Sequence, residues 1–337
     1  MRILAYESTT GGGVAGLPIP EELAREGAAM LASLLSDLSD LEGVDALTTR
    51  DNRLGPPTWS NETVFPLPGE DPLAHFARAA HEADAVWPIA PETDGVLETL
   101  TNLIIAHDKI LLGSRPDAVR ITSSKWHTAE CLREAGIPVV PTYREAAQIS
   151  DLPGNWVIKP DDGAGCGDTF RLNDAGAARA WLDGDIQRRF VAQPWIEGDP
   201  LSLSLVCRDG HANVLSCNRQ HVRENCGQLI LQDVAVGIRP IGADLYELAR
   251  RITRAVPGLW GYVGIDLVYS ASGPVVMEIN PRLTGSYCGL RSKLGVNVAA
   301  VVLRLLDGTT RCCASSNPEF ACTAMPAQSP GDTHHVV

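Results

Sequence analysis

The sequence predicts an α/β fold that becomes α+β towards the C-terminus. In the first 120 residues of the 337-residue chain, apolar strand-like segments alternate with amphipathic helical segments, which indicates a parallel sheet. After residue 196 strand patterns dominate, and two of them flank a turn short enough for a hairpin. Hydrophobic residues make up 45% of the chain, enough for two or three small domains with cores of their own.

The first domain is expected over residues 1–120. A strand at 2–7 precedes a glycine turn, and apolar residues from Leu23 to Leu38 recur at three- and four-residue steps, which predicts a helix. The later elements are a helix near 72–83, a strand at 83–92 and a helix near 94–107. Ligands of such sheets bind outside the carboxyl ends of the strands, which here carry Gly11–Gly13 and Glu92.

A central domain is expected over residues 121–195. Its first helix ends at Gly136, with Pro138 just beyond. The segment WVIKP then predicts a strand, DDGAGCGDTF a glycine-rich loop and AGAARAWL a helix. The sequence therefore places a lysine, Lys159, at the end of a strand and directly before the loop.

The third domain is expected over residues 196–310. Three β segments lead to a helix near 243–255, and a last helix is expected near 297–306. Between these helices, GYVGIDLVYS and GPVVMEIN predict the hairpin. Residues 311–337 lack periodicity, so we expect a poorly ordered tail.

Composition excludes several classes of function. The net charge of −13 leaves no basic stripe for a general nucleic-acid binder, although a nucleotide substrate remains compatible with it. Nine cysteines without a C-x-x-C pair argue against a zinc ribbon or a disulfide scaffold and favour free thiols in the cytoplasm. We see no signal peptide and no apolar run of membrane-spanning length, so no membrane partner is expected.

Two lysines are candidate phosphate ligands. Lys159 precedes the loop Asp162–Asp168, whose glycines would let backbone N–H groups turn towards an anion. Lys125 starts a helix, where the helix dipole disfavours a cation unless an anionic ligand is bound. Taken alone, the loop is explained about as well by a plain glycine turn, and Lys125 is better explained as an ordinary solvated lysine.

The segment QPWIEGDPLSLSL is a candidate adenosine site. An apolar linker between β segments would offer its backbone groups to a purine edge, and Glu197 or Asp199 would reach a ribose hydroxyl. The alternative is a simple interdomain strand with solvated acidic residues.

The predicted hairpin carries a candidate metal site. Because residues i and i+2 of a strand share a face, Val276, Glu278 and Asn280 are expected on one side, and Val275, Met277 and Ile279 on the other. A turn centred near Ser272 would place Asp266 opposite Glu278. Two carboxylates and an amide oxygen suit Mg²⁺, which fills its coordination shell with water and phosphate oxygens. A chance surface cluster is the less favoured alternative.

The order of these motifs resembles the ATP-grasp superfamily of carboxylate–amine ligases. The series runs from Lys125 through Lys159 and its loop to the linker, Asp266 and E-I-N-P-R, and spans roughly residues 110 to 300. The resemblance implies an ATP-grasp fold with an N-terminal parallel α/β pre-ATP-grasp domain. It also implies an ADP-forming ligase that joins an acid to an amine through an acyl phosphate.

The resemblance assigns roles to single residues. Two Mg²⁺ or Mn²⁺ ions would be bound by Asp266, Glu278 and Asn280, and Arg282 would steady the acyl phosphate. The expected ATP ligands are Lys125, Lys159, Asp162, Gly163, Gly165, Gly167, Gln193, Trp195, Ile196 and Glu197 or Asp199. One departure concerns adenine recognition, because the family often has an acid where this chain has Gln193.

The N-terminal third resembles the tyramine–glutamate ligases of methanofuran-type cofactor biosynthesis. The similarity rests on MRILAYESTTGGG, LAREGAAMLASLLSDL and IAPETDGVLETL. It implies glutamate and tyramine as substrates. Arg219, or else Arg223, would then pair with the α-carboxylate of glutamate. Gly12, Gly13 and Glu92 are further candidates for substrate contact.

Several rival interpretations stay open. The chain could join another acid–amine pair, or it could bind a nucleotide without chemistry, although the intact lysines and acids argue against the second reading. A dinucleotide-dependent oxidoreductase is less favoured, because LPIP interrupts the helix that should follow the glycine turn. A homodimer is compatible with the sequence, and small molecules are the expected partners.

Overall fold

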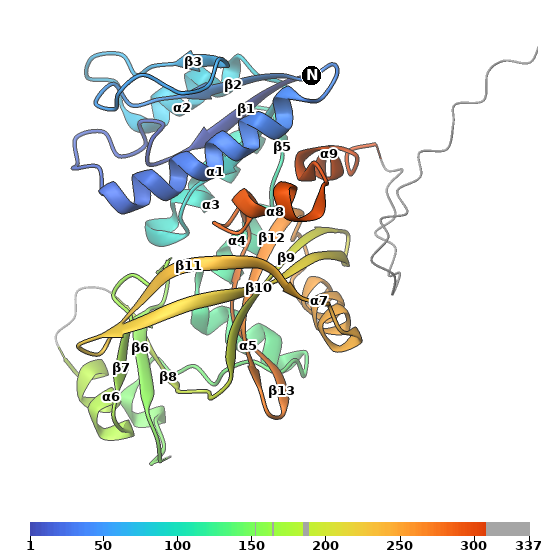
Figure 1. The fold of residues 1–337 in the computed structure, drawn as a ribbon. Helices are drawn as coiled ribbons and strands as arrows, with labels where there is room; N and C mark the ends of the chain where they lie inside the picture. The colour runs from blue at the N-terminus through green and yellow to red at the C-terminus, as the bar shows by residue number, and fades with distance from the viewer. Residues whose placement is uncertain (152, 164, 185–188, 308–337) are drawn as a thin grey trace, which may run out of the picture.

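The computed structural model contains two sheets, one above the other in Figure 1. The structure describes residues 1–151, 153–163, 165–184 and 189–307. The C-terminal helices α8 (Tyr287–Leu294) and α9 (Val298–Leu303) lie between the sheets and contact α1 (Glu21–Ser39) of the N-terminal part. The predicted tail at 311–337 lies outside the described residues, and the domain boundaries stay predictions.

The N-terminal sheet is parallel throughout, in the order β3-β2-β1-β4-β5. Its strands are β1 (Arg2–Glu7), β2 (Asp45–Thr49), β3 (Glu62–Val64), β4 (Ala85–Ile89) and β5 (Ile110–Leu111). Because the two central strands are β1 and β4, their carboxyl ends lie side by side. The glycine turn and Glu92 therefore meet at one edge of this sheet.

The second sheet has the order β13-β12-β9-β10-β11-β7-β6-β8. Its strands are β6 (Trp156–Pro160), β7 (Phe170–Leu172), β8 (Phe190–Pro194), β9 (Asp199–Arg208), β10 (His211–Asn225), β11 (Gln228–Arg239), β12 (Gly261–Ser270) and β13 (Gly273–Asn280). All recorded pairings between these strands are antiparallel. The predicted change from α/β to α+β is thereby confirmed.

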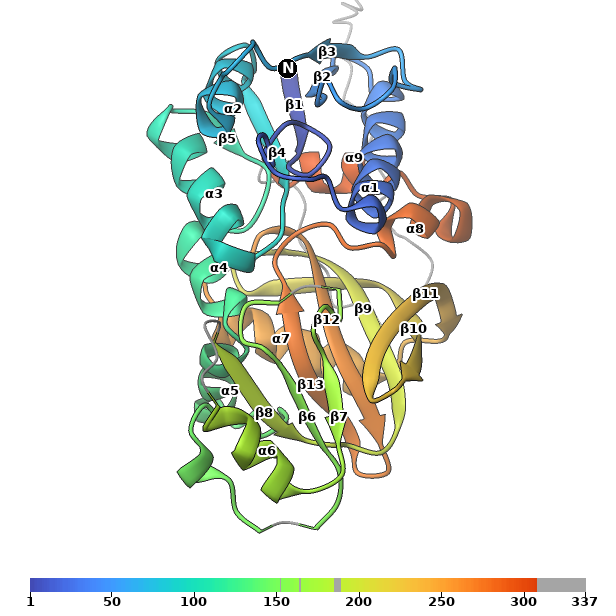
Figure 2. The ribbon, with the colours of Figure 1, turned by 90° about the vertical axis from the view of Figure 1, so that its left-hand side faces the viewer.

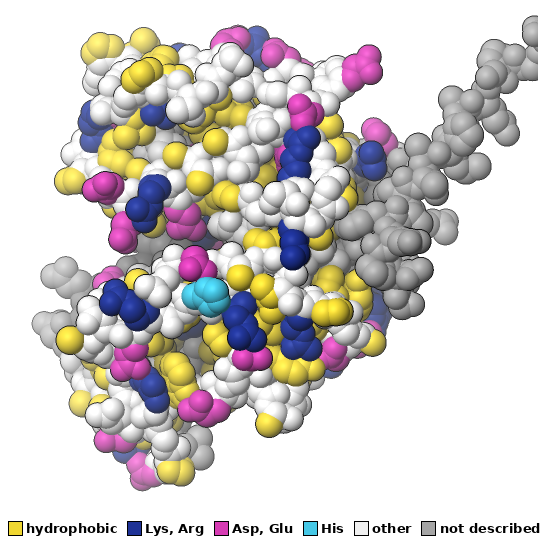
Figure 3. All heavy atoms as spheres, viewed as in Figure 1, with side chains coloured by type: hydrophobic (Ala, Val, Ile, Leu, Met, Phe, Trp, Pro, Cys, Tyr) yellow, Lys and Arg dark blue, Asp and Glu magenta, His cyan; other side chains and the backbone are white. Residues whose placement is uncertain are grey.

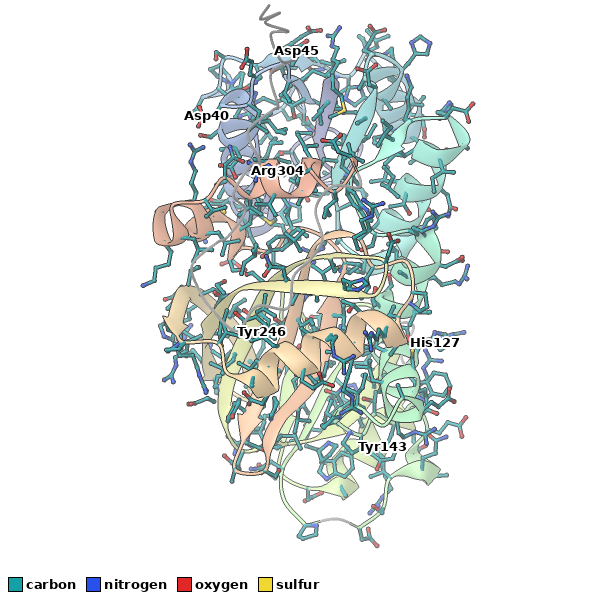
Figure 4. All side chains as sticks on the ribbon, turned by 90° about the vertical axis from the view of Figure 1, so that its right-hand side faces the viewer. Asp40, Asp45, His127, Tyr143, Tyr246 and Arg304 are labelled. Carbon is teal, nitrogen blue, oxygen red and sulfur yellow. The ribbon has the colours of Figure 1, made fainter. Side chains whose placement is uncertain are left out.

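The helices flank the sheets (Figures 1 and 2). The remaining helical segments are α2 (Pro72–His81), α3 (Val96–Ala106), α4 (Pro116–Ser123), α5 (Lys125–Glu134), α6 (Ala175–Leu182), α7 (Ala243–Ala255), and the 3₁₀ turns η1 (Thr93–Gly95) and η2 (Ala146–Gln148). Figure 4 shows α7, which carries the labelled Tyr246, across one face of the second sheet. Among the described helices, none is long and apolar enough to cross a bilayer.

Of the four hydrophobic clusters in the described residues, one spans both sheets. A single cluster joins Ile3 of β1 and Leu34 of α1 to Tyr262 of β12, Leu283 and Val302 of α9. Hydrogen bonds between polar side chains also join the N-terminal part to α8. The buried carboxylate of Asp37 accepts hydrogen bonds from Tyr287 Oη at 2.7 Å and from Arg291 Nη1 at 3.0 Å. The N-terminal part is therefore joined to the C-terminal helices by both apolar and polar contacts.

The predicted faces of β13 are wrong for Val276 and Met277. Asp266 pairs with Glu278, as predicted, but the next pair joins Leu267 to Val276, which leaves Met277 as a β-bulge. The extra residue shifts the alternation, so Val276 turns into the apolar core and Met277 lines the cavity beside Glu278. Strands β2, β3, β5 and β7 and helices α4 and α8 were not predicted.

Candidate active site

A cavity of about 390 Å³ opens between the two ends of the second sheet. Its walls come from β6 and the glycine loop, the β8–β9 linker, one face of β10 and the β12–β13 hairpin. The residues that line it include Lys125, Lys159, Gly163, Gly167, Gln193, Trp195, Ile196, Asp266 and Glu278. The structure thus gathers these nine sequence-predicted residues around one space, whereas Arg282, Asn280, Asp162 and Gly165 do not line it.

Two lysines converge on one carboxylate at an end of this cavity. Lys125 Nζ lies 3.2 Å and Lys159 Nζ 3.9 Å from Glu278 Oε2. All three side chains are largely buried. Burial and the nearby positive charge of Lys125 lower the pKa of Lys159, while the negative charge of Glu278 opposes this shift. Among the described residues, both ammonium groups form their ion pair with the same carboxylate, that of Glu278.

Asp266 and Glu278 have opposite electrostatic surroundings. Burial and the charge of Glu278 raise the pKa of Asp266 to about 7. Burial would also raise the pKa of Glu278, but the charges of Lys125 and Lys159 hold it well below the usual range. Like charges on neighbouring strands repel each other unless a cation or a proton lies between them.

The donor set fits a divalent cation. Asn280 Nδ2 donates to Asp266 Oδ2 at 3.3 Å, so the amide and both carboxylates form one patch. Within the described ranges, no group of three or more His, Cys, Asp or Glu side chains could hold a metal. Two carboxylates and an amide oxygen would therefore depend on phosphate oxygens to complete an octahedral shell.

Asp161 holds the start of α5, which carries Lys125, close to the end of β6, which carries Lys159. Its backbone carbonyl accepts from Lys125 N, and its carboxylate accepts from Trp126 N at 2.9 Å. Arg144 Nη2 also donates to Asp161 Oδ2 at 2.6 Å, while the Arg144 guanidinium stacks 4.3 Å from the Trp126 ring. The first turn of α5 is thereby fixed against the end of β6, which carries Lys159.

The glycine loop closes one side of the cavity. Lys125 Nζ donates to Gly163 O at 2.5 Å. Gly165 has a left-handed backbone with φ of 63° and open space around it, so a flexible turn is available there. On the outer side, Asp162 contacts the N-terminal part, where its backbone oxygen accepts from Thr93 Oγ1 at 3.0 Å.

The linker carries two buried polar atoms without partners among the described residues, Gln193 Oε1 and Trp195 Nε1. Gln193 is fully buried, and its Nε2 donates to Thr142 Oγ1 at 2.9 Å. An unpaired buried acceptor costs free energy unless a ligand donates to it. Because Gln193 lines the cavity, a purine amino group fits this position.

The acids proposed for the ribose lie outside the cavity lining. Glu197 and Asp199 are exposed, and Asp199 Oδ2 pairs with Arg219 Nη2 at 3.3 Å. Residues alternate along β10, so Gln220, Val222 and Glu224 line the cavity while Arg219 and Arg223 do not. Charged side chains of both signs cover the outer side of the β10–β11 ribbon in Figure 3. The roles of these four residues stay predictions.

Arg282 is held by Glu92 from the N-terminal part. Its Nε lies 3.0 Å from Glu92 Oε1, and its Nη2 lies 2.9 Å from Glu92 Oε2. The charge of Glu92 raises the pKa of the Arg282 guanidinium although burial opposes this shift. The sequence named both residues but gave no sign that they touch, because 190 positions separate them.

The glycine turn after β1 is shaped by its own contacts. The carboxylate of Glu7 accepts from Thr9 N at 3.1 Å and from Thr10 N at 2.7 Å. A Cβ at Gly13 would come 2.6 Å from Ser8 O. Gly12 has a φ of 97° and packs against His75. The turn therefore requires glycine for its geometry, and substrate contact by Gly12 or Gly13 stays a prediction.

Sequence reasoning missed several residues of the site. They are Asp161, Arg144, Arg171, Gln220 and Met277. Arg171 stacks on the Trp195 ring at 4.4 Å, which fixes one wall of the cavity. An acid directly after the strand WVIKP was the one visible signal, for Asp161; the other contacts join segments far apart in the chain.

Family models match most of the chain. A model described as an ATP-grasp domain matches residues 122–286, and one described as a pre ATP-grasp 3 domain matches residues 44–119. The expected fold is thereby confirmed.

Curated relatives agree with these matches. Tyramine–L-glutamate ligase of Methanocaldococcus jannaschii is 24% identical over 275 residues, which are 81% of this chain and 80% of that protein. A probable α-L-glutamate ligase of Xanthomonas oryzae pv. oryzae is 25% identical over 206 residues, 58% of this chain and 68% of that protein.

Solved structures share the architecture. An ATP-grasp superfamily protein from Archaeoglobus fulgidus superposes with a TM-score of 0.69 at 26% identity, covering 90% of this chain and 88% of that one. L-amino acid ligase from Bacillus licheniformis gives 0.62 at 16% identity, covering 90% and 73%. At such low identity, the second likeness shows the fold alone.

Proposed function

The chain belongs to the ATP-grasp superfamily of carboxylate–amine ligases, and we propose that it joins L-glutamate to tyramine with hydrolysis of ATP to ADP and phosphate. One observation carries the ATP-dependent part of the proposal. Lys125 and Lys159 converge on Glu278 opposite Asp266, at the end of a cavity whose other end carries the unpaired Gln193 Oε1. Cations and acids that line the same cavity as an unpaired buried acceptor support the binding of a nucleoside triphosphate.

The proposed first step activates the substrate carboxylate. A carboxylate oxygen attacks the γ-phosphorus of ATP, the bond from that phosphorus to the bridging oxygen breaks, and ADP leaves. Lys125 and Lys159 lie where they would neutralise phosphate charge, and the glycine loop would shield the phosphates from water. The products of this step are ADP and an acyl phosphate.

The proposed second step forms the amide. The amine nitrogen attacks the acyl carbon, the carbon–oxygen bond to phosphate breaks, and the nitrogen loses a proton. No side-chain nucleophile is required. Arg282, buried beside Glu92, would offer its guanidinium to the phosphate that leaves.

Asp266, Glu278 and Asn280 would hold the divalent cation, with Mg²⁺ preferred on the chemistry of this donor set. When bound, the cation would neutralise charge on the transferred phosphoryl group. A metal ligand must be deprotonated, so the raised pKa of Asp266 would make cation binding weaker below about pH 7.

The choice of glutamate and tyramine rests on similarity to the archaeal ligases named for these substrates, which spans 81% of this chain. The proposal extends to a cytoplasmic location, because the six cysteines in the described residues are free thiols. Small molecules are the proposed partners.

The test is an ADP-release assay with purified protein, Mg²⁺ and ATP, in which acids and amines are varied in pairs. Glutamate with tyramine should give ADP and the amide in equal amounts, and chelation of the metal should stop both. Turnover only with another pair would contradict the substrates and leave the ligase assignment intact.

The metal assignment has its own variant. Glu278→Gln keeps the size of the side chain but removes the charge that faces Asp266. It should abolish Mg²⁺-dependent ADP release while the folded protein persists. Full activity in this variant would refute the metal role of Glu278.

A further inference from the structure

We infer that Glu92 is the positioning residue for Arg282. Through this contact the N-terminal part sets the orientation of the Arg282 guanidinium, which follows strand β13 of the second sheet. The inference rests on the proposed function. It assigns Glu92 to Arg282 instead of to a substrate.

The contact between the two side chains is bidentate and buried. Glu92 accepts from Nε and from Nη2 of Arg282, and the exposed fractions of the side chains are 6% and 11%. A third bond runs from Arg282 Nη1 to Leu283 O at 3.0 Å. A guanidinium has five N–H groups, so within the described residues two keep no protein partner. Those two groups are available for a phosphate or carboxylate in a direction that Glu92 sets.

The loop that carries Arg282 is also held by contacts with strand β12. Tyr262 Oη lies 3.1 Å from Thr284 Oγ1 and 3.0 Å from Ser286 Oγ. A Cβ at Gly264 would come 2.7 Å from Thr284 Cγ2, so the loop packs directly on β12. With the backbone held in this way, the long side chain is the part of Arg282 that still needs orientation, and Glu92 supplies it.

The same segment reaches the glycine loop. Next to Glu92, Thr93 Oγ1 donates to Asp162 O and Asp94 N donates to Asp162 Oδ2, both at 3.0 Å. Asp94 adopts a left-handed backbone with φ of 56°, which is uncommon for a residue other than glycine. Residues 92–94 therefore contact Arg282 on one side and the start of the glycine loop on the other. These contacts hold the backbone of Glu92 in position beside Arg282.

The kinetic test compares Glu92→Gln with Glu92→Asp. Misplacement of a reacting group by about 1 Å costs about 100-fold in rate. We therefore expect kcat of Glu92→Gln to fall by about 10- to 100-fold, with KM for acid and amine and Kd for ATP changed by less than about threefold. Glu92→Asp keeps the charge and should recover part of the loss. In an Arg282→Lys background, Glu92→Gln should have little further effect.

Asp37→Asn is the matched control. Asp37, on α1, also pairs with an arginine across the same boundary, but that arginine is Arg291 of α8, which has no role in the proposed chemistry. Both variants should lower the unfolding midpoint, and only Glu92→Gln should lower kcat. An unchanged kcat in Glu92→Gln, or a raised KM for one substrate at constant kcat, would overturn the inference.

A second readout needs no turnover. In the ¹⁵N spectrum of the full chain, the Arg282 Nε–H should exchange with water about tenfold or more slowly than the Nε–H of exposed arginines, because it is buried and bonded. The signal is assigned by its loss in Arg282→Lys and should lose protection in Glu92→Gln but not in Asp37→Asn. Fast exchange in the wild type would refute the contact even if every substrate pair fails.

Discussion

Asp266 faces Glu278 because β13 bulges at Met277. The hairpin closes with Ser270 paired to Gly273, and the register runs without a break to Leu267 and Val276. Continued unbroken, it would pair Asp266 with Met277 and would place Glu278 opposite Ile265, whose side chain lies in the core. The extra residue brings the two carboxylates together. The sequence prediction of this pair was therefore correct, although the turn lies half a residue from the assumed centre.

Deletion of Met277 should leave Asp266 opposite Glu278. Without the extra residue, the register that joins Leu267 to Val276 continues regularly, and Glu278 becomes the next partner of Asp266. Binding of Mg²⁺-ATP in calorimetry should therefore persist in the deletion variant. Met277→Leu keeps the residue count and should bind nearly as the wild type does. Complete loss of binding by a folded deletion variant would contradict this account of the bulge.

Lys159→Ala should weaken ATP binding by about tenfold or more, equal to about 1.4 kcal/mol. The lysine is buried beside Glu278 and Lys125, and without it one of two cations at the phosphate end is lost. Lys109→Ala is the control, because Lys109 bonds to backbone carbonyls of His81 and Ala83 in the N-terminal part. Equal dissociation constants for the Lys159 variant and the wild type would count against a phosphate role.

Gln193→Leu should reduce the preference for ATP over GTP. Loss of a buried acceptor that a ligand pairs costs about 1–3 kcal/mol, so ATP affinity should fall by about fivefold or more while GTP gains relative to it. Thr142→Val removes the partner of Gln193 Nε2 and should lower stability without changing the nucleotide ratio. An unchanged ratio in Gln193→Leu would place adenine elsewhere.

Stability should depend on His75 below neutral pH. Burial lowers the pKa of this residue below its ordinary 6.5, with Nε2 on Gly11 O at 3.1 Å and Arg78 Nη2 beside Nδ1 at 3.1 Å. As the pH falls, His75 is therefore protonated in the unfolded chain at a higher pH than in the folded protein. The contribution of His75 to the free energy of unfolding is complete above about pH 6.5. It decreases as the pH falls from there to the pKa of His75 in the folded protein, by about 1.4 kcal/mol for each unit by which folding lowers that pKa.

Chemical unfolding at pH 7.5 and pH 5 measures this dependence. His75→Asn does not titrate in this range, so it should lose less stability between the two pH values than the wild type does. Equal losses in both proteins would show that other groups carry the pH dependence.

Local patterns were sufficient for much of the fold. Periodicity located α1, end signals located α5, and strand patterning located the β12–β13 hairpin. The motif order gave a family resemblance that the matched domains and relatives confirm. Strand β2 was missed because DALTT is a short segment without a clear alternation. Helix α8 was missed because its apolar face is covered only when it packs on α1.

The sequence by itself determined which residue types are present for the chemistry, since lysines, acids and glycines occur in a recognisable order along the chain. Tertiary structure decided which of them meet. Asp161 positions Lys125 through contacts that join a strand end to a helix start, and Glu92 reaches Arg282 across 190 positions. Such contacts depend on packing between sheets and on register, and a single bulge at Met277 changes both. Neither leaves a periodic signal in the sequence.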